Sequence, residues 1–170
     1  MITNETTQMT EAQTMVLTRT FNAPLSHVWK AWTESECVKQ WWGPQGFHCP
    51  VAMMDVREGG TSLVCMRTNG FDIYNTWTYS KILPQGLLEY VLRFSDQDGN
   101  PLDPAAIGLP PGIPKEVPHQ VTFKSVGNKT VVTVTESGYS SEQVAEISKA
   151  GMSQCLDKMD VLLSSLNQNN

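Results

Sequence analysis

Residues 141–166 read SEQVAEISKAGMSQCLDKMDVLLSSL, and this stretch decides the fold. Steps of three or four residues select one side of a helix that is apolar or small throughout. That side consists of Val144, Ser148, Gly151, Cys155, Met159, Leu162 and Leu166, with Met152 at its margin. The opposite side carries Glu, Gln and Lys. We therefore expect an amphipathic helix that packs on another layer of the protein.

The middle of this apolar side is small, whereas its C-terminal half is bulky. Ser148, Gly151 and Cys155 lie in succession along it. A glycine inside a helix costs about 1 kcal/mol relative to alanine, so Gly151 indicates a packing or functional reason. Either another backbone packs closely here or a space is left open. The sequence leaves both alternatives.

Length, charge and cysteine spacing favour one cytoplasmic domain. The 170 residues carry a net charge of -5 and no run of Lys or Arg, which argues against a nucleic-acid partner. No stretch reaches the eighteen or more apolar residues of a membrane span, and the N-terminus does not resemble a secretory leader. Four cysteines are widely spaced without a CxxC pair, and we expect them to be reduced. Those cysteines are Cys37, Cys49, Cys65 and Cys155.

Strand and helix patterns follow one another in a defined order. We expect a loose tail over residues 1–12 and a single domain over residues 13–167. Alternation predicts a strand over 14–21, then two short helices up to residue 42, then strands over 51–56, 61–68, 71–82, 87–94, 117–126 and 129–137. The proline-rich stretch 96–118 is predicted to be an irregular loop, because proline cannot donate to a sheet ladder.

This order predicts the α+β class. Strands that follow one another while the helices are kept apart are typical of α+β proteins. The simplest packing is an antiparallel sheet curved around the last helix, with one sheet face in water.

Several motifs resemble one known family. Ala23-Pro24, Val28-Trp29, Trp32-Thr33 and, most specifically, Trp41-Trp42-Gly43-Pro44 are similar to the signature of the homologues of the activator of heat-shock-protein-90 ATPase. That family belongs to the START-like (SRPBCC, Bet v 1-like) superfamily. The resemblance implies the helix-grip fold, with a curved antiparallel sheet of about six to seven strands around a long C-terminal helix and two short helices after the first strand.

The resemblance also implies a cavity between the sheet and the last helix. Many relatives hold a hydrophobic small molecule there, others perform chemistry such as polyketide cyclisation, and in the chaperone activator itself this domain binds the chaperone. The sequence departs from the family at Met152, where a Trp is usual, and in the longer loop 96–118. We expect Met152 to give an adaptable wall and the loop to cover the cavity mouth.

Strand parity, together with the helix pattern, predicts the side chains that face this cavity. The candidates are Trp41, Trp42, Cys65, Arg67, Asn75, Trp77, Tyr79, Tyr90, Leu92, Phe94, His119, Val121, Phe123, Glu136, Ser148, Gly151, Met152 and Cys155. The aliphatic members also suit simple core packing. Adjacent helical residues point about 100° apart, so we expect one of Trp41 and Trp42 in the core and the other at the cavity mouth or on a partner surface.

The polar candidates each have a plainer alternative. Asn75, Arg67, His119 and Glu136 would supply the few polar groups that a ligand site uses. His119 also suits an exposed or hydrogen-bonded histidine, Glu136 a solvated strand end, and Arg67 a surface position beside a hairpin turn.

Three functions remain open, and we favour binding of a small hydrophobic or amphipathic ligand. A protein-interaction module acting on a chaperone ATPase would need an exposed apolar patch near Trp41-Trp42 or the proline-rich loop. A cyclase- or hydrolase-like enzyme would need two of Arg67, His119 and Glu136 within hydrogen-bond reach. A homodimer is a further alternative.

Familiar catalytic motifs are missing from the sequence. It contains no GxSxG, HExxH or P-loop. His27, His48 and His119 lack metal-ligand spacing to one another or to the cysteines. We therefore expect no metal, no cofactor and no assigned catalytic residue.

Overall fold

The computed structural model describes residues 12–168, so the predicted tail lies outside the described residues except for its last position. Seven strands form one antiparallel sheet in the order β1-β7-β6-β5-β4-β3-β2 within that part of the chain. The strands are β1 (Gln13–Phe21), β2 (His48–Met53), β3 (Thr61–Thr68), β4 (Phe71–Leu83), β5 (Leu87–Ser95), β6 (Glu116–Val126) and β7 (Lys129–Tyr139). The first and last strands are neighbours, so the sheet joins the two ends of the domain.

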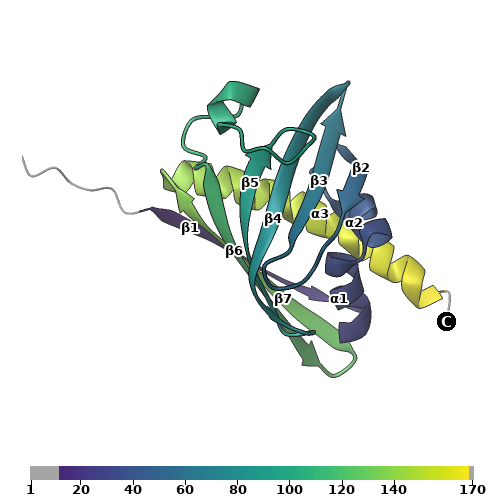
Figure 1. Ribbon diagram of the computed structural model, residues 1–170. Coiled ribbons are helices and arrows are strands. Elements are labelled where there is room, and N and C mark those ends of the chain that lie inside the picture. Colours follow the sequence, from purple (N-terminus) through teal and green to yellow (C-terminus); the bar gives the residue numbers. More distant parts are fainter. Residues whose placement is uncertain (1–11, 169–170) are drawn as a thin grey trace, which may run out of the picture.

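The three α-helices of the described residues all lie on one side of this sheet (Figure 1). The long α3 (Glu142–Gln168) crosses the concave face. The short α1 (Leu25–Thr33) and α2 (Ser35–Trp41) lie beside its C-terminal half. This is the helix-grip arrangement that the sequence predicted.

The C-terminal half of α3 anchors the domain. Its buried side chains are Cys155, Leu156, Met159, Leu162 and Leu163. Full burial of one such Leu or Met contributes about 1.5–3 kcal/mol. A polar tether adds to this packing, because Arg19 of β1 donates to Asp157 at 2.7 Å and to the Ser153 hydroxyl at 2.9 Å.

Three predicted segments had a boundary that was wrong by two or more residues. One is the strand predicted over 129–137, which is β7 and continues to Tyr139. The strand predicted over 51–56 is β2, which starts at His48 and ends at Met53. The stretch predicted to be irregular contains a short 3-10 helix, η1 (Pro104–Ile107), and ends at Lys115, because β6 starts at Glu116 and includes Pro118 opposite Val91 of β5. Pairing of β6 with β7 starts only at His119, so the missing N–H of Pro118 leaves no gap in that ladder.

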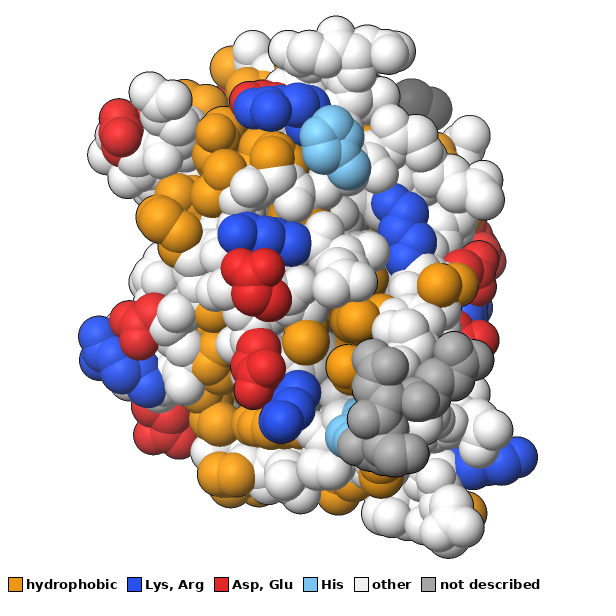
Figure 2. Space-filling view, turned by 90° about the vertical axis from the view of Figure 1, so that its right-hand side faces the viewer, with side chains coloured by type: hydrophobic (Ala, Val, Ile, Leu, Met, Phe, Trp, Pro, Cys, Tyr) orange, Lys and Arg blue, Asp and Glu red, His pale blue; other side chains and the backbone are white. Residues whose placement is uncertain are grey.

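The side of the molecule at the C-terminal end of α3, which is the right-hand side of Figure 1, is mixed in character. In Figure 2 apolar side chains lie among Lys, Arg, Asp and Glu side chains. None of the helices in the described residues is both long and apolar enough to cross a membrane.

Candidate functional site

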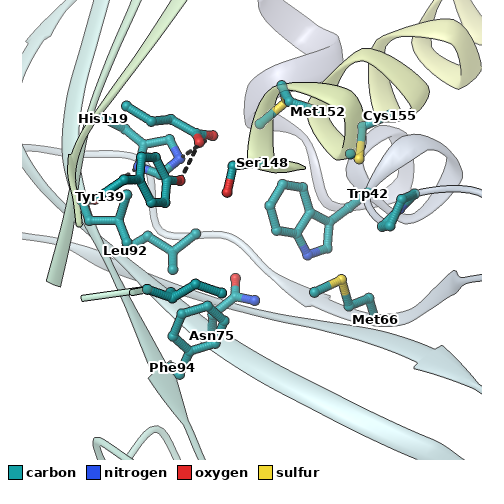
Figure 3. A pocket seen from close by; sticks show the side chains of 16 residues that line it. Trp42, Met66, Asn75, Leu92, Phe94, His119, Tyr139, Ser148, Met152 and Cys155 are labelled. Atoms are coloured by element: carbon teal, nitrogen blue, oxygen red, sulfur yellow. Dashed lines mark hydrogen bonds and ion pairs between the residues drawn. The ribbon is translucent and has the colours of Figure 1, made fainter. Parts of the chain in front are cut away.

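A cavity of about 160 Å³ lies between the N-terminal half of α3 and the sheet (Figure 3). Strands β3 to β7, the turn after α2 and the loop before β6 contribute its walls. The lining residues are Trp42, Gly43, Pro44, Met66, Asn75, Leu92, Phe94, Ile113, Val117, His119, Glu136, Tyr139, Ser148, Gly151, Met152 and Cys155. An engineered apolar cavity of about 150 Å³ holds one benzene molecule, so this space suits a single ring.

The small residues of α3 leave this space open. Apart from the two chain neighbours of Gly151 and the backbone of its own helix, nothing lies within 4 Å of a Cβ placed on this residue. Of the two alternatives for Gly151, close backbone packing is therefore wrong and open space is right. Ser148, one turn earlier on α3, faces the same cavity.

The two adjacent tryptophans are both buried, with different roles. Trp41 ends α2 in the core, and its indole N–H donates to the Ala31 carbonyl at 2.6 Å. Trp42 follows the helix in extended backbone, φ -71° and ψ 126°, so its side chain also turns inward and lines the cavity. Neither forms the exposed apolar patch that the protein-interaction hypothesis predicted near them. Gly43 follows with φ +111°, a backbone conformation that residues with a side chain rarely adopt.

Two buried N–H donors at the cavity have no partner among the described residues. They are Nε1 of Trp42 and Nδ2 of Asn75. Asn75 is 1% exposed and Trp42 is 7% exposed. The other end of the Asn75 amide is fixed, because its Oδ1 accepts a hydrogen bond from Trp77 Nε1 at 3.1 Å. The NH₂ group is therefore the end that remains for another partner.

An acidic and a basic side chain meet on the opposite wall. His119 Nε2 lies 3.0 Å from Glu136 Oε1, and Tyr139 donates to Glu136 Oε2 at 2.6 Å. Sheet register creates this cluster, because Tyr90, His119 and Glu136 are direct neighbours across β5, β6 and β7. The enzyme hypothesis required two of Arg67, His119 and Glu136 to lie within hydrogen-bond reach of each other. His119 and Glu136 meet this requirement.

Hydrogen-bond geometry orients the His119 ring. Its Nδ1 lies 2.9 Å from the Val117 carbonyl, which can only accept, so Nδ1 carries a hydrogen. Nε2 is then the ring nitrogen that faces the Glu136 carboxyl, 3.0 Å from Oε1.

Burial keeps the neighbouring hydroxyl and thiol protonated. Burial, followed by the nearby Glu136, raises the pKa of Tyr139 above its ordinary value. Burial also raises the pKa of the Cys155 thiol to about 12. At neutral pH, Tyr139 is therefore a donor to Glu136, and Cys155 is an unreactive part of the wall.

A row of rings forms the support beneath the cavity. Trp42 packs edge-on against Trp77 at 5.1 Å between ring centroids, and Trp77 stacks on Tyr90 at 5.1 Å. Tyr90 stacks in turn on His119 at 4.8 Å. These contacts connect the wall with the unpartnered donors to the wall with the acidic cluster.

Long-range contacts hold two loops at the cavity. Lys158 of α3 donates to the carbonyls of Gly43, Pro44 and Phe47 at 2.7, 3.2 and 2.8 Å. The loop before β6 packs on the start of α3 at Gly112, where a Cβ would collide with the Ser140 hydroxyl. Ile113 of that loop lines the cavity, in agreement with the position expected for the proline-rich stretch.

The structure brings ten of the predicted cavity residues together. These are Trp42, Asn75, Leu92, Phe94, His119, Glu136, Ser148, Gly151, Met152 and Cys155. Six others are buried in the core without lining the cavity, namely Trp41, Trp77, Tyr79, Tyr90, Val121 and Phe123.

The predicted face of β3 was wrong. Cys65 pairs with Tyr74 and Arg67 pairs with Asp72, so both side chains lie on the face of the sheet opposite the cavity. Arg67 forms a two-pronged ion pair with Asp72 there, which lowers the pKa of the Asp72 carboxyl. Both faces of β3 are apolar near its middle, so alternation gave no guide to its orientation.

Six lining residues were missed. They are Gly43, Pro44, Met66, Ile113, Val117 and Tyr139. Met66 was missed with the face of β3. Tyr139 was missed because the strand was predicted to end at residue 137. A register shift in the β1–β7 pairing, with Gly138 at φ +96°, places Tyr139 on the same face as Glu136.

The described residues contain no group of three or more His, Cys, Asp or Glu side chains placed to hold a metal ion. The four cysteines are free thiols.

Comparison with known proteins identifies the family. The family model described as Activator of Hsp90 ATPase homolog 1-like protein matches residues 22–164. The chain belongs to this family. Membership agrees with the motifs around Trp41-Trp42-Gly43-Pro44 and with the START-like superfamily that they indicated. No curated protein matches the sequence.

Solved structures of similar proteins share the fold. A protein from Chromobacterium violaceum has a TM-score of 0.72 and 22% identity over 88% of this chain and 96% of its own. A protein from Arthrobacter aurescens has a TM-score of 0.73 and 23% identity over 89% of this chain and 86% of its own. The AHSA1 protein from Silicibacter pomeroyi has a TM-score of 0.71 and 16% identity over 93% of this chain and all of its own.

Proposed function

We propose that this domain binds a small hydrophobic or amphipathic molecule in the cavity under α3. The observation that carries the proposal is the open space in front of Gly151, within a lining that is mostly apolar. Apolar pockets with a few convergent polar groups are the usual form of small-molecule sites. A mid-helix glycine that packs against nothing has a cost of about 1 kcal/mol, and space for a ligand accounts for it.

Native mass spectrometry of the purified protein, followed by denaturing extraction, tests this proposal. We expect a complex that is heavier than the chain and an extract that contains one apolar compound. The same spectrum reports whether the protein is a monomer or a homodimer. A protein that stays empty after incubation with a library of ring-sized apolar compounds would contradict the proposal.

The family description favours a second candidate, action on a chaperone ATPase. The burial of Trp41 and Trp42 removes them from such an interface, which leaves the loop before β6 and the mixed outer surface. The ATPase rate of purified heat-shock protein 90, measured with and without this domain, decides this candidate. An unchanged rate at saturating domain concentration would exclude it.

The pair of His119 and Glu136 favours a third candidate, proton-transfer chemistry of the cyclase or hydrolase type. Both side chains line the cavity, and His119 Nε2 lies 3.0 Å from Glu136 Oε1, within reach for a proton transfer. A general base needs only to reach the proton that it removes. Hydrogen–deuterium exchange beside the carbonyl of cyclohexanone in heavy water is the test, since a Glu136→Gln variant should lose any acceleration that the protein gives.

A further inference from the structure

The unpartnered donors at the cavity indicate which functional group a ligand needs. This inference rests on the proposed function, because it requires that a molecule binds in the cavity. Trp42 Nε1 and Asn75 Nδ2 are buried, and each has a hydrogen to donate and no acceptor among the described residues. Such a donor costs free energy until an acceptor meets it. In Figure 3 both nitrogens turn toward the same side of the cavity.

An acceptor reaches these donors when a neighbouring side chain moves. Both nitrogens are shielded from solvent in the structure, and the Met66 side chain, which lines the same cavity, points toward them in Figure 3. Methionine is unbranched and adaptable. Met66 can therefore move aside without a change in the backbone of β3.

The charges around the cavity exclude an anionic acceptor. No Lys or Arg lines it. His119, which can carry a positive charge, lies with its Nε2 3.0 Å from Glu136 Oε1, so the Glu136 carboxyl already occupies that nitrogen. The nearby Lys158 ammonium is already bound by three carbonyls. A carboxylate in this cavity would therefore be a buried charge without a partner, which is strongly unfavourable.

The cavity wall with the unpartnered donors of Trp42 and Asn75 also disfavours an alcohol. A hydroxyl group accepts hydrogen bonds but must also donate one. The Asn75 Oδ1 atom already accepts from Trp77 and keeps one lone pair, and the Trp42 indole has no acceptor atom, so a hydroxyl proton would find at most one acceptor on this wall. A carbonyl oxygen accepts two hydrogen bonds and donates none, so it matches both donors.

We infer that the cavity selects a neutral, ring-sized carbonyl compound and binds it with the carbonyl oxygen on Trp42 Nε1 and Asn75 Nδ2. The ring then lies over the apolar side chains between the two polar ends, with Gly151 above it. The volume of about 160 Å³ suits one six-membered ring.

Four small probes test this inference on the wild-type protein. Cyclohexanone is the ketone, methylenecyclohexane replaces its oxygen with a CH₂ group, cyclohexanol carries a hydroxyl, and cyclohexanecarboxylate is the anion. We expect cyclohexanone to bind roughly tenfold more tightly than methylenecyclohexane, because two neutral hydrogen bonds are gained. The alcohol and the carboxylate should also bind less tightly than the ketone.

The NMR signals of the indole N–H groups report directly on the proposed hydrogen bond in the wild-type protein. This readout does not require a variant to bind a probe. In protein labelled with ¹⁵N-tryptophan, the Trp42 signal should shift on addition of cyclohexanone and stay in place with methylenecyclohexane. The Trp42→Phe variant assigns that signal. Trp32 is a matched control, because its Nε1 is also buried and unpartnered but lies outside the cavity lining, so its signal should move with neither probe.

The Trp42→Phe and Asn75→Leu variants should each reduce the preference for ketone over hydrocarbon by about three- to fivefold, while the affinity for methylenecyclohexane stays similar. Equal affinity of the wild-type protein for the two probes, or ketone binding without a shift of the Trp42 signal, would overturn the inference and leave the proposed function intact. Binding of none of the four probes would overturn both.

Discussion

The carboxylate of Glu136 shows what a buried polar group requires. It is 4% exposed, and each of its oxygens has a partner, His119 on one and Tyr139 on the other. Charges in the interior are tolerated when they are paired and hydrogen-bonded. The cavity therefore has a polar wall that is complete by itself, opposite a wall whose donors are incomplete.

This difference predicts unequal effects of two substitutions. Glu136→Gln should cost about 1 kcal/mol or less, because the glutamine amide can donate to neutral His119 and accept from Tyr139. His119→Phe should cost about 3–5 kcal/mol, because it leaves the carboxylate buried with one partner. Urea unfolding of the two variants measures both values.

The double variant His119→Phe/Glu136→Leu separates charge from packing. It should be more stable than His119→Phe alone, because the unpaired carboxylate is gone. If His119→Phe lost no more stability than Glu136→Gln, the pairing described for this wall would be incorrect.

At the scale of the element, α3 divides into two parts with different tasks. Its C-terminal half carries Leu156, Met159 and Leu163, which are fully buried and stabilise the domain. Its N-terminal half carries Ser148 and Gly151, which leave the cavity open. One helix thus both stabilises the fold and forms the roof of the site.

Substitutions at Gly151 test this division. Gly151→Ala should raise the free energy of unfolding by about 1 kcal/mol, because alanine favours the helix and its Cβ has room. Gly151→Leu should fold but fill the cavity and abolish binding of cyclohexanone. Thermal unfolding and the indole N–H titration measure the two effects.

Ala150 provides the matched control on the same helix. It is exposed, so Ala150→Leu adds the same side chain outside the cavity and should leave binding unchanged. A loss of stability in Gly151→Ala would mean that the space in front of Gly151 is filled in the folded protein.

At the scale of the whole molecule, the sheet and α3 enclose hydroxyl groups that water cannot reach. Tyr79, Tyr90 and Tyr139 come from three strands, and burial is the main cause that raises the pKa of each above its ordinary value of 10.0. Their protonated forms are therefore favoured in the folded state and less so in the unfolded chain.

This shift predicts unfolding at alkaline pH. Below pH 10 the contribution of these hydroxyls to stability is complete, and it is lost as the pH rises above 10, because the unfolded chain releases those protons more easily. Phenolate absorbance and circular dichroism should change together as the pH rises. Phenolate formation by all four tyrosines in a protein that stays folded would contradict the burial described here.

Part of the site followed from sequence alone and part did not. The WWGP motif, the parity of β4 to β6 and the helix stripe placed Trp42, Asn75, His119 and Gly151 among the candidates. Parity failed for β3, where both faces are apolar, and for Tyr139, where a bulge changes the face. Alternation gives the relative orientation of neighbouring residues, and it says nothing of which face a strand presents when both are apolar.

The sequence by itself determined the architecture and the family. Hydrophobic periods of two and of 3.6 residues are local properties, so they can be read before the chain folds. Three features became apparent only in the folded structure: the open space in front of Gly151, the contact between His119 and Glu136, and the unpartnered N–H donors of Trp42 and Asn75. Each feature depends on the register between strands and on which atoms meet across the core. The distances between those atoms cannot be read from the order of residues in the sequence.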